Sequence, residues 1–308
     1  MDIVVCFFVL GMLGRLLKAD LEFPAGLHRG LTVFLMVAIG LKGGEALAQH
    51  GSLQLVLQGA LVIVLGVVTT LLVFPVLRWF GGFSRLNAAT LAAHYGSVSV
   101  GTYAVAVAFL ESRGIAYEAY FPLFVALLEM PAIAIGLILA QQREPTEGWK
   151  PVLAEIGRSQ GLFLMAGGLV IGALASEQMS SVSPLFKDLF KGVLALFLLE
   201  MGVMAAARLG ELKHSVAFVV AYGVFFPLLG AVLGGGLGGL MGLSTGGVIL
   251  LAVLGASSSY IAVPAAMRSA LPQANHSIAI TSSLGVTFPF NVVVGIPLYY
   301  AFVMWFMN

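Results

Sequence analysis

Three consecutive serines, Ser257–Ser259, lie inside a long apolar stretch and are followed by Pro264. Serine and proline weaken a helix, and at membrane depth such a break is tolerated only where protein or a wet cavity surrounds it. A second hydroxyl-rich stretch contains Ser97, Ser99 and Thr102. Hydroxyls and the free N–H groups of the helix that follows each break can hold a small oxyanion without a buried lysine or arginine. The sequence therefore predicts an anion site near the bilayer midplane.

The two stretches occupy corresponding positions in the two halves of the chain. A shift of 159 residues places Gly96 on Gly255, and at a slightly longer offset Gly40 is echoed by Gly202. We expect two inverted five-helix repeats, because interrupted helices at corresponding positions form the substrate site in transporters of that build. The alternative is that these runs of small residues only let helices pack closely.

Other polar residues within apolar stretches are candidates for the same site. An ionisable side chain at membrane depth is costly, so Glu129 is predicted to bind a cation, relay a proton or pair with a backbone N–H group. Glu200 is a candidate for the same roles, or it lies near a helix end. His94 is interpreted as a packed or hydrogen-bonded histidine rather than a proton carrier, and Thr287 and Asn291 are predicted to line the cavity.

The composition is that of a polytopic membrane protein. Of the 308 residues, 60% are hydrophobic and 9% are charged, whereas a soluble domain carries about 25% charged residues. A net charge of +1 argues against a nucleic-acid partner. The single cysteine, Cys6, excludes an internal disulfide framework and a cysteine-rich metal site, and no resident cofactor is expected.

Ten apolar segments approach the length of about 20 residues that spans a bilayer. They cover residues 2–17, 27–48, 53–79, 88–110, 118–141, 160–176, 185–207, 214–241, 246–268 and 277–306. The predicted fold is an all-α polytopic membrane protein with about ten transmembrane helices, broken at the midplane. We assign residues 1–141 to the first repeat, 142–159 to a linker, and 160–308 to the second, inverted repeat.

The basic residues are divided unequally between the two ends of such a bundle. One end holds Arg15, Lys18, Arg29, Arg78, Arg85, Arg143, Lys150, Arg158, Arg208, Lys213 and Arg268. The other holds Lys42, Arg113, Lys187 and Lys191. Because cytoplasmic loops carry the excess of basic residues, we expect a cytoplasmic linker and both termini outside, in a multi-pass protein of the plasma (inner) membrane.

The serines are also compatible with a different class of function, an intramembrane hydrolase. Ser257 with His276 or His94 would supply a nucleophile and a base. However, the glycine expected after a nucleophilic serine is missing, and the sequence has neither paired intramembrane aspartates nor an HExxH motif. We therefore expect no enzymatic activity.

Several motifs follow one another along nearly the whole chain. They are Leu110-Glu111-Ser112, Tyr117-Glu118-Ala119, Glu129-Met130-Pro131-Ala132, Arg208-Leu209-Gly210-Glu211-Leu212-Lys213, Ala256-Ser257-Ser258-Ser259, Pro264, Arg268, Leu271-Pro272-Gln273-Ala274-Asn275, Thr281-Ser282-Ser283 and Gly295-Ile296-Pro297-Leu298. In order and spacing they resemble the sodium-dependent bicarbonate transporters first known from cyanobacteria. The central linker is shorter than in the best-known members.

The resemblance implies a core domain and a gate domain that move by an elevator-like mechanism, in a homotrimer. In some members a small PII-like regulatory protein binds from the cytoplasm. Bicarbonate and sodium are implied between the broken helices. The predicted substrate- and ion-binding residues are Ser97, Ser99, Gly101, Thr102, Glu129, Ser257, Ser258, Ser259, Tyr260 and Asn291. The sodium ligands among them are predicted to be Ser99, Thr102, Glu129 and Ser258.

The chain departs from the family pattern at several positions. Tyr260 stands where the family has an aspartate after the three serines, and Glu129 where it typically has an aspartate. Val100-Gly101 stands where the family usually has glycine and then serine. Tyrosine supplies a hydroxyl but no charge at neutral pH, so the loss of the aspartate bears on sodium coupling. Glu129 could substitute for it electrostatically.

The sequence thus predicts a secondary transporter that imports a small anion, bicarbonate first, coupled to sodium. One alternative is a transporter of another small anion coupled to protons. The other is a transport-inactive anion-binding receptor or regulatory membrane subunit, in which Tyr260 plugs the site.

Overall fold

The computed structural model describes residues 2–19, 21, 23–24, 26–140, 160–210 and 216–307, and every regular element in this part of the chain is a helix. The first half contains α1 (Ile3–Leu16), α2 (Leu27–His50), α3 (Leu53–Pro75), η1 (Val76–Phe80), α4 (Arg85–Gly96), α5 (Val100–Glu111) and α6 (Phe121–Ala140). The second half contains α8 (Gln160–Leu174), η2 (Ser176–Gln178), α9 (Met179–Ser183), η3 (Pro184–Asp188), α10 (Phe190–Gly210), α11 (Val216–Leu240), α12 (Thr245–Ala256), α13 (Ala262–Ala270), α14 (His276–Ile280), η4 (Thr281–Thr287), α15 (Phe288–Phe290), η5 (Asn291–Gly295) and α16 (Ile296–Met307). The predicted linker 142–159 lies outside the described residues, as do residues 211–213 of one quoted motif.

Within the described residues, seven continuous helical stretches are long and apolar enough to cross a membrane. They are Leu27–Gln49, Leu53–Phe80, Arg85–Glu111, Phe121–Ala140, Ser176–Leu209, Ala217–Leu240 and His276–Met307. Three shorter apolar helices, Ile3–Leu16, Gln160–Leu174 and Thr245–Ala256, fall in the remaining predicted segments. The all-helical membrane class is therefore confirmed, whereas ten crossings stay a prediction.

Short polar residues fix where several of these helices begin. Ser52, Ser84 and Ser244 each precede a helix, and their hydroxyls accept a backbone N–H bond from its first turn at 3.1 to 3.2 Å. Asp2 does the same for α1, with 3.1 Å between its Oδ1 and the Val4 nitrogen. These side chains satisfy N–H groups that have no partner inside the helix.

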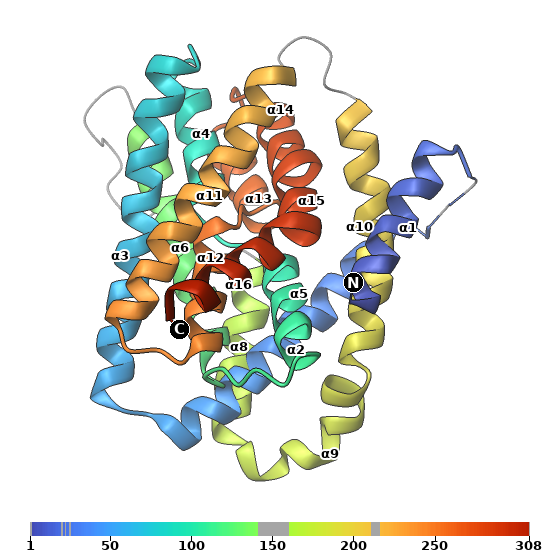
Figure 1. Cartoon of the computed structure of the whole chain (residues 1–308), viewed down its shortest axis with the longest axis vertical. Helices are drawn as coiled ribbons and strands as arrows, with labels where there is room; N and C mark the ends of the chain where they lie inside the picture. Colours follow the sequence, from blue (N-terminus) through green and yellow to red (C-terminus); the bar gives the residue numbers. More distant parts are fainter. Residues whose placement is uncertain are drawn as a thin grey trace.

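The closest helix pairs are α1 with α10, α2 with α8, and α11 with α12. Figure 1 shows α1 and α10 side by side at the right of the molecule, and α11 and α12 at the left. Glycines allow this approach: a Cβ on Gly202 would strike the Phe8 carbonyl, and one on Gly230 would strike the Gly255 carbonyl. Small residues at such contacts let backbones pack directly against each other.

The broken helix made by α4 and α5 lies in the interior of the bundle. Within Arg85–Glu111, the 18 consecutive residues that are most apolar are all buried. Every residue from Val100 to Leu110 of α5 and from Gly246 to Leu254 of α12 is buried. An interrupted backbone is therefore enclosed by protein, as the bilayer demands.

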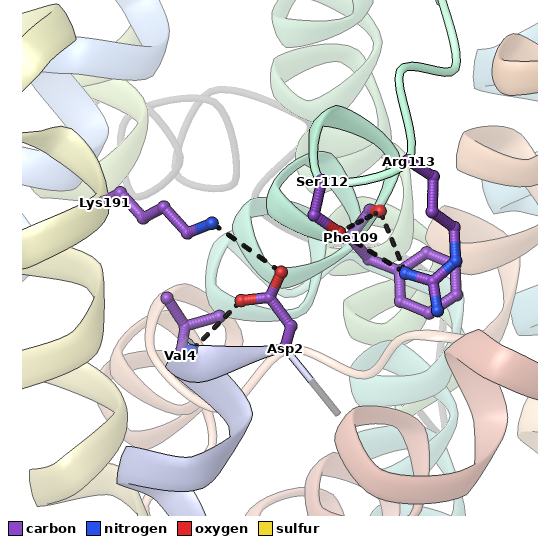
Figure 2. A network of polar contacts seen from close by, with 6 residues as sticks. All are labelled: Asp2, Val4, Phe109, Ser112, Arg113 and Lys191. Carbon is purple, nitrogen blue, oxygen red and sulfur yellow. Dashed lines mark hydrogen bonds and ion pairs between the residues drawn. The ribbon is translucent and has the colours of Figure 1, made fainter.

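Two ion pairs join Lys187 and Lys191 to carboxylates from other parts of the chain. Lys191 lies 3.7 Å from Asp2 at the start of α1, a contact that Figure 2 shows beside the stacking of Arg113 on Phe109. Lys187 forms a 2.8 Å ion pair with Glu45. The start of α1 therefore lies beside the start of α10.

Candidate functional site

The two helix breaks cross each other directly. The first break is Ser97–Ser99, between α4 and α5, and the second is Ser257–Ile261, between α12 and α13. The Ser99 N–H group donates to the Ser257 hydroxyl at 3.1 Å, and the Ser259 N–H group donates to the His94 carbonyl at 2.9 Å. Backbone groups freed by one break are therefore satisfied by the other.

The serine hydroxyls mainly brace the two breaks. Ser99 accepts a 3.0 Å hydrogen bond from the Thr102 N–H group and so caps α5. Ser257 donates to the Leu254 carbonyl at 2.8 Å, and Ser259 accepts from the Val263 N–H group at 3.3 Å. The hydroxyls of Ser99, Ser257 and Ser259 thus have partners within the protein, and their contact with a substrate stays a prediction.

Ser258 and His94 meet at a residue that the sequence reasoning did not assign to the site, Ser283. The Ser258 hydroxyl is 2.7 Å from that of Ser283, which in turn is 3.2 Å from His94 Nδ1. His94 Nδ1 also lies 2.6 Å from the Ser259 carbonyl. Because a carbonyl only accepts, Nδ1 carries the proton and the imidazole ties α4 to the second break. His94 is therefore the hydrogen-bonded histidine that the sequence favours.

Asn291 completes the end of α12. Its side-chain N–H group donates to the Ala256 carbonyl at 2.8 Å, and its side-chain oxygen accepts from the Tyr299 hydroxyl at 2.8 Å. Ala256 is the last residue of α12, so its carbonyl has no partner within the helix. Asn291 is buried completely and contacts the residue directly before the second break.

Tyr260 extends from the second break to the start of α5. Its ring contacts Phe288 edge to face at 5.1 Å, and its hydroxyl lies where a Cβ on Gly101 would be placed. The hydroxyl is near the Ser99 side chain but completes no hydrogen bond of normal geometry with any described residue. Only glycine at position 101 leaves room for this ring.

Several buried polar atoms around the crossing have no hydrogen-bond partner in the described part of the chain. They are Ser97 Oγ, His94 Nε2, Tyr260 Oη and Glu129 Oε2. Buried polar groups are usually satisfied by protein or an ordered ligand. These four atoms are therefore the groups with which an ion or a small polar solute could form new contacts.

Glu129 lies on the face of α6 that meets α4 and α13. Ile133, one turn further along, packs with Ala93 and Val263. The Glu129 side chain is 1% exposed, and its unpartnered Oε2 does not make the N–H pairing that the sequence allowed. No hydrogen bond between Glu129 and the serines of the breaks is present in the described structure. Its role in binding a cation or a proton stays a prediction.

Hydrogen bonds of the described residues join only two of the four predicted sodium ligands directly, and the sodium site stays a prediction. Ser99 and Thr102 meet through the cap of α5, whereas the Ser258 hydroxyl contacts Ser283 instead. Among the described residues, no group of three or more His, Cys, Asp or Glu side chains could hold a metal ion. A sodium site made of the predicted residues would combine hydroxyl and carbonyl oxygens with the single carboxylate of Glu129.

Phe197 and Glu200 of α10 approach the start of α5 from the other side. A Cβ on Gly101 would lie 2.9 Å from the Phe197 ring. His28 stacks on this ring with 5.9 Å between centroids, and its Nδ1 lies 3.4 Å from Glu200 Oε2. Glu200 is buried and therefore belongs to the interior of the bundle. Its partner His28 was not predicted, because a single histidine early in an apolar stretch gives no periodic pattern.

Thr287 joins a second polar cluster that the sequence also missed. The Tyr95 hydroxyl contacts the hydroxyls of Ser282 and Thr287, the latter at 2.9 Å. Thr287 donates in turn to the Gly223 carbonyl at 2.8 Å. The three consecutive hydroxyl residues 281–283 are the sequence feature that could have indicated both clusters. Their side chains at Ser282 and Ser283 contact Tyr95 and His94 of α4.

The hydrolase geometry is not formed. The Ser257 hydroxyl is engaged by Leu254 and Ser99. His94 Nδ1 contacts Ser259 and Ser283, and His276 Nε2 lies 2.9 Å from the Leu271 carbonyl. Neither histidine hydrogen-bonds to Ser257 in the structure as described.

The fold and the crossing together define a class, a multi-pass membrane protein in which two interrupted helices meet inside the bundle. Over residues 3–304 the chain matches the model of the Na⁺-dependent bicarbonate transporter superfamily. The chain belongs to this superfamily, which confirms the resemblance drawn from its motifs and indicates a transporter rather than an enzyme. Among curated proteins, none matches the chain.

Proposed function

We propose that this protein is a secondary transporter that imports a small anion, and that the anion is bicarbonate. The observation that carries the proposal is the crossing of the two broken helices at Ser99 and Ser257. The N–H groups of Val100 and Gly101 have no acceptor among the described residues. An oxyanion at this end of α5 would therefore find free donors and the positive end of the helix.

The test is uptake of labelled bicarbonate into proteoliposomes by the wild type and by Ser258→Leu. We expect the bulky side chain to separate Ser258 from Ser283 and to abolish saturable uptake without preventing membrane insertion. The control is Ser180→Leu, an exposed serine of α9, which should transport normally. Normal uptake by Ser258→Leu would refute the site.

We propose sodium as the coupling ion, with Glu129 as the anionic group that replaces the family's aspartate. The support is that Glu129 is buried and that its Oε2 has no partner in the described structure. Sodium-stimulated uptake should be lost in Glu129→Gln. If sodium has no effect on the wild type but a proton gradient does, and Glu129→Gln abolishes that effect, the coupling ion is the proton.

A second candidate function is a transport-inactive anion receptor or regulatory subunit. Its support is the position of Tyr260, whose hydroxyl lies against Gly101 at the start of α5. The receptor hypothesis predicts bicarbonate binding without flux in the wild type, and flux in Tyr260→Ser. Saturable uptake by the wild type would eliminate it.

We also propose that the helices form two inverted five-span repeats. Two pairs of equivalent contacts support this architecture. Gly96 and Gly255 each pack against a glycine carbonyl of the preceding helix, that of Gly66 and that of Gly230. Equally, Gly40 of α2 packs against α8 and Gly202 of α10 packs against α1. Residues that the sequence placed in register therefore make corresponding contacts.

The remaining proposals follow from the family. We propose a homotrimer in the plasma (inner) membrane that works by an elevator-like motion of a core domain against a gate domain. The linker would be cytoplasmic, where a PII-like regulator could bind, and both termini outside. Light scattering of the purified protein should give three copies of the 32.3 kDa chain, and a protease added outside should not cut the linker.

A further inference from the structure

A small cavity lies between α2, α8 and the second break, away from the crossing itself. Its volume is about 150 Å³. The residues that matter for its chemistry are His28, Arg29, Thr32, Val33, Gln160 and Ile261. Ile261 adjoins Tyr260 in the chain, so the cavity runs from the second break toward the ends of α2 and α8 that carry Arg29 and Gln160.

The wall of this cavity offers a hydroxyl that has no partner and a nearby cation. Thr32 Oγ1 is buried and has no hydrogen-bond partner in the part of the chain that the structure describes, whereas His28 Nδ1 faces Glu200 Oε2 at 3.4 Å. Arg29 adds a guanidinium, which is always charged. All three lie in the first two turns of α2, a 24-residue helix whose start has no side-chain cap. A positive helix end, a cation and a free hydroxyl together favour an oxyanion.

The charge of the cavity wall and the volume of the cavity limit the kind of ligand that it can bind. The described residues that line the cavity include no carboxylate. Glu200 contacts His28 at 3.4 Å but is not part of the lining. Cavities that bind drug-sized or nucleotide-sized ligands measure about 300–1,000 Å³. A volume of about 150 Å³ therefore suits a small oxyanion with a few waters.

We propose that this cavity is a second anion site, which binds a small oxyanion of the bicarbonate class through Arg29 and Thr32. It would hold the anion between the helix crossing and the end of the molecule at Arg29. Its place on a transport path rests on the proposed function, whereas the binding itself does not.

The experiment uses a cysteine reporter in the cavity wall. Val33→Cys is made in a Cys6→Ser background, and its reaction with a methanethiosulfonate reagent is followed in purified full-length protein. Bicarbonate, compared with chloride at constant pH and ionic strength, should slow the reaction severalfold. Arg29→Gln and Thr32→Val should each raise the bicarbonate concentration needed for half-protection, by about tenfold for Arg29.

Two matched substitutions serve as controls. Arg78→Gln removes an exposed arginine that donates to the Phe83 carbonyl, and Thr69→Val removes a hydroxyl that bonds within its own helix to Leu65. Neither residue lines the cavity, so protection should be unchanged in both. Isothermal titration of bicarbonate into the same variants gives a readout that needs no reagent, and Arg29→Gln should lose one of two binding events.

The outcomes separate this inference from the proposed function. Protection that Arg29→Gln and Thr32→Val leave unchanged, with one binding event in the titration, would overturn the second site even if uptake is normal. Protection that depends on Arg29 in a protein without uptake would sustain the site and reject transport. Equal protection by chloride would show a nonselective anion site and overturn the assignment to oxyanions.

Discussion

The two breaks differ in what holds them. The first, Ser97–Ser99, is short, and Ser99 itself caps the helix that follows. The second, Ser257–Ile261, is longer, and no side chain at Ile261 caps α13. It is held instead by residues from distant parts of the chain, His94, Ser283 and Asn291. One break is therefore fixed mainly by local sequence and the other mainly by tertiary contacts.

This difference assigns different tasks to the two breaks. The start of α5 supplies N–H groups and depends on Gly101 having no side chain. The second break supplies Tyr260, whose ring reaches across to that glycine. Substitutions that act on one break and spare the other should separate these tasks.

The largest expected effect is at Gly255, just before the second break. A Cβ there would strike the Gly230 carbonyl, and backbone cannot swing aside as a side chain can. Gly255→Ala should destabilise the purified protein by about 3 kcal/mol, measured as a fall in the unfolding midpoint in detergent. Gly239→Ala, at a helical glycine with open space around it, is the control and should not be destabilised.

The second-largest loss of stability is expected at Asn291, which supports the second break from a distant part of the chain. Asn291→Ala leaves the Ala256 carbonyl and the Tyr299 hydroxyl without their partner, which should cost about 2 kcal/mol because both are buried. The same unfolding assay measures it. Asn87→Ala removes a bond to Asn275 at an exposed site and should cost clearly less. Equal losses would show that the second break does not depend on Asn291.

A smaller loss of stability is expected at Gly101, where the two breaks contact each other. Gly101→Ala places a methyl group against Tyr260, Phe197 and Phe288, all of which are side chains. We expect a loss of about 1.5 kcal/mol, much of it recovered in the double variant Gly101→Ala/Tyr260→Ser. Additive losses in this double-mutant cycle would contradict the contact between Tyr260 and Gly101.

The smallest effect compares the hydroxyl caps. Ser99→Ala should cost about 1 kcal/mol, because Ser99 is the N-cap of α5. Ser259→Ala should cost less, since its bond to Val263 is longer at 3.3 Å and other residues hold that break. The unfolding midpoints of the two variants test the order, and the reverse order would show that local capping dominates at both breaks.

The sequence predicts the helices and the positions of both breaks because these follow from local composition. Apolar stretches of spanning length are read directly, and Ser257–Ser259 followed by Pro264 interrupts one of them visibly. The family resemblance also followed from motifs, and the match over residues 3–304 confirms it.

The partners across the site were not predictable in the same way. His94 contacts Ser259 from 165 residues away, and its second contact, Ser283, lies 189 residues away. Such pairings depend on how the helices cross, which residue types alone do not encode. For the same reason the contact of the Ser258 hydroxyl with Ser283 was not predictable, and substrate binding by Ser258 stays a prediction.

The most direct test of the central claim is the initial rate of labelled bicarbonate uptake into wild-type proteoliposomes, with and without an inward sodium gradient. We predict saturable uptake that the gradient stimulates, because we propose that the crossed breaks bind the anion and that Glu129 supports the cation. Saturable uptake without stimulation would keep the anion site and reject sodium coupling. Uptake no faster than that of protein-free liposomes under either condition would contradict the claim that the crossed helices carry bicarbonate.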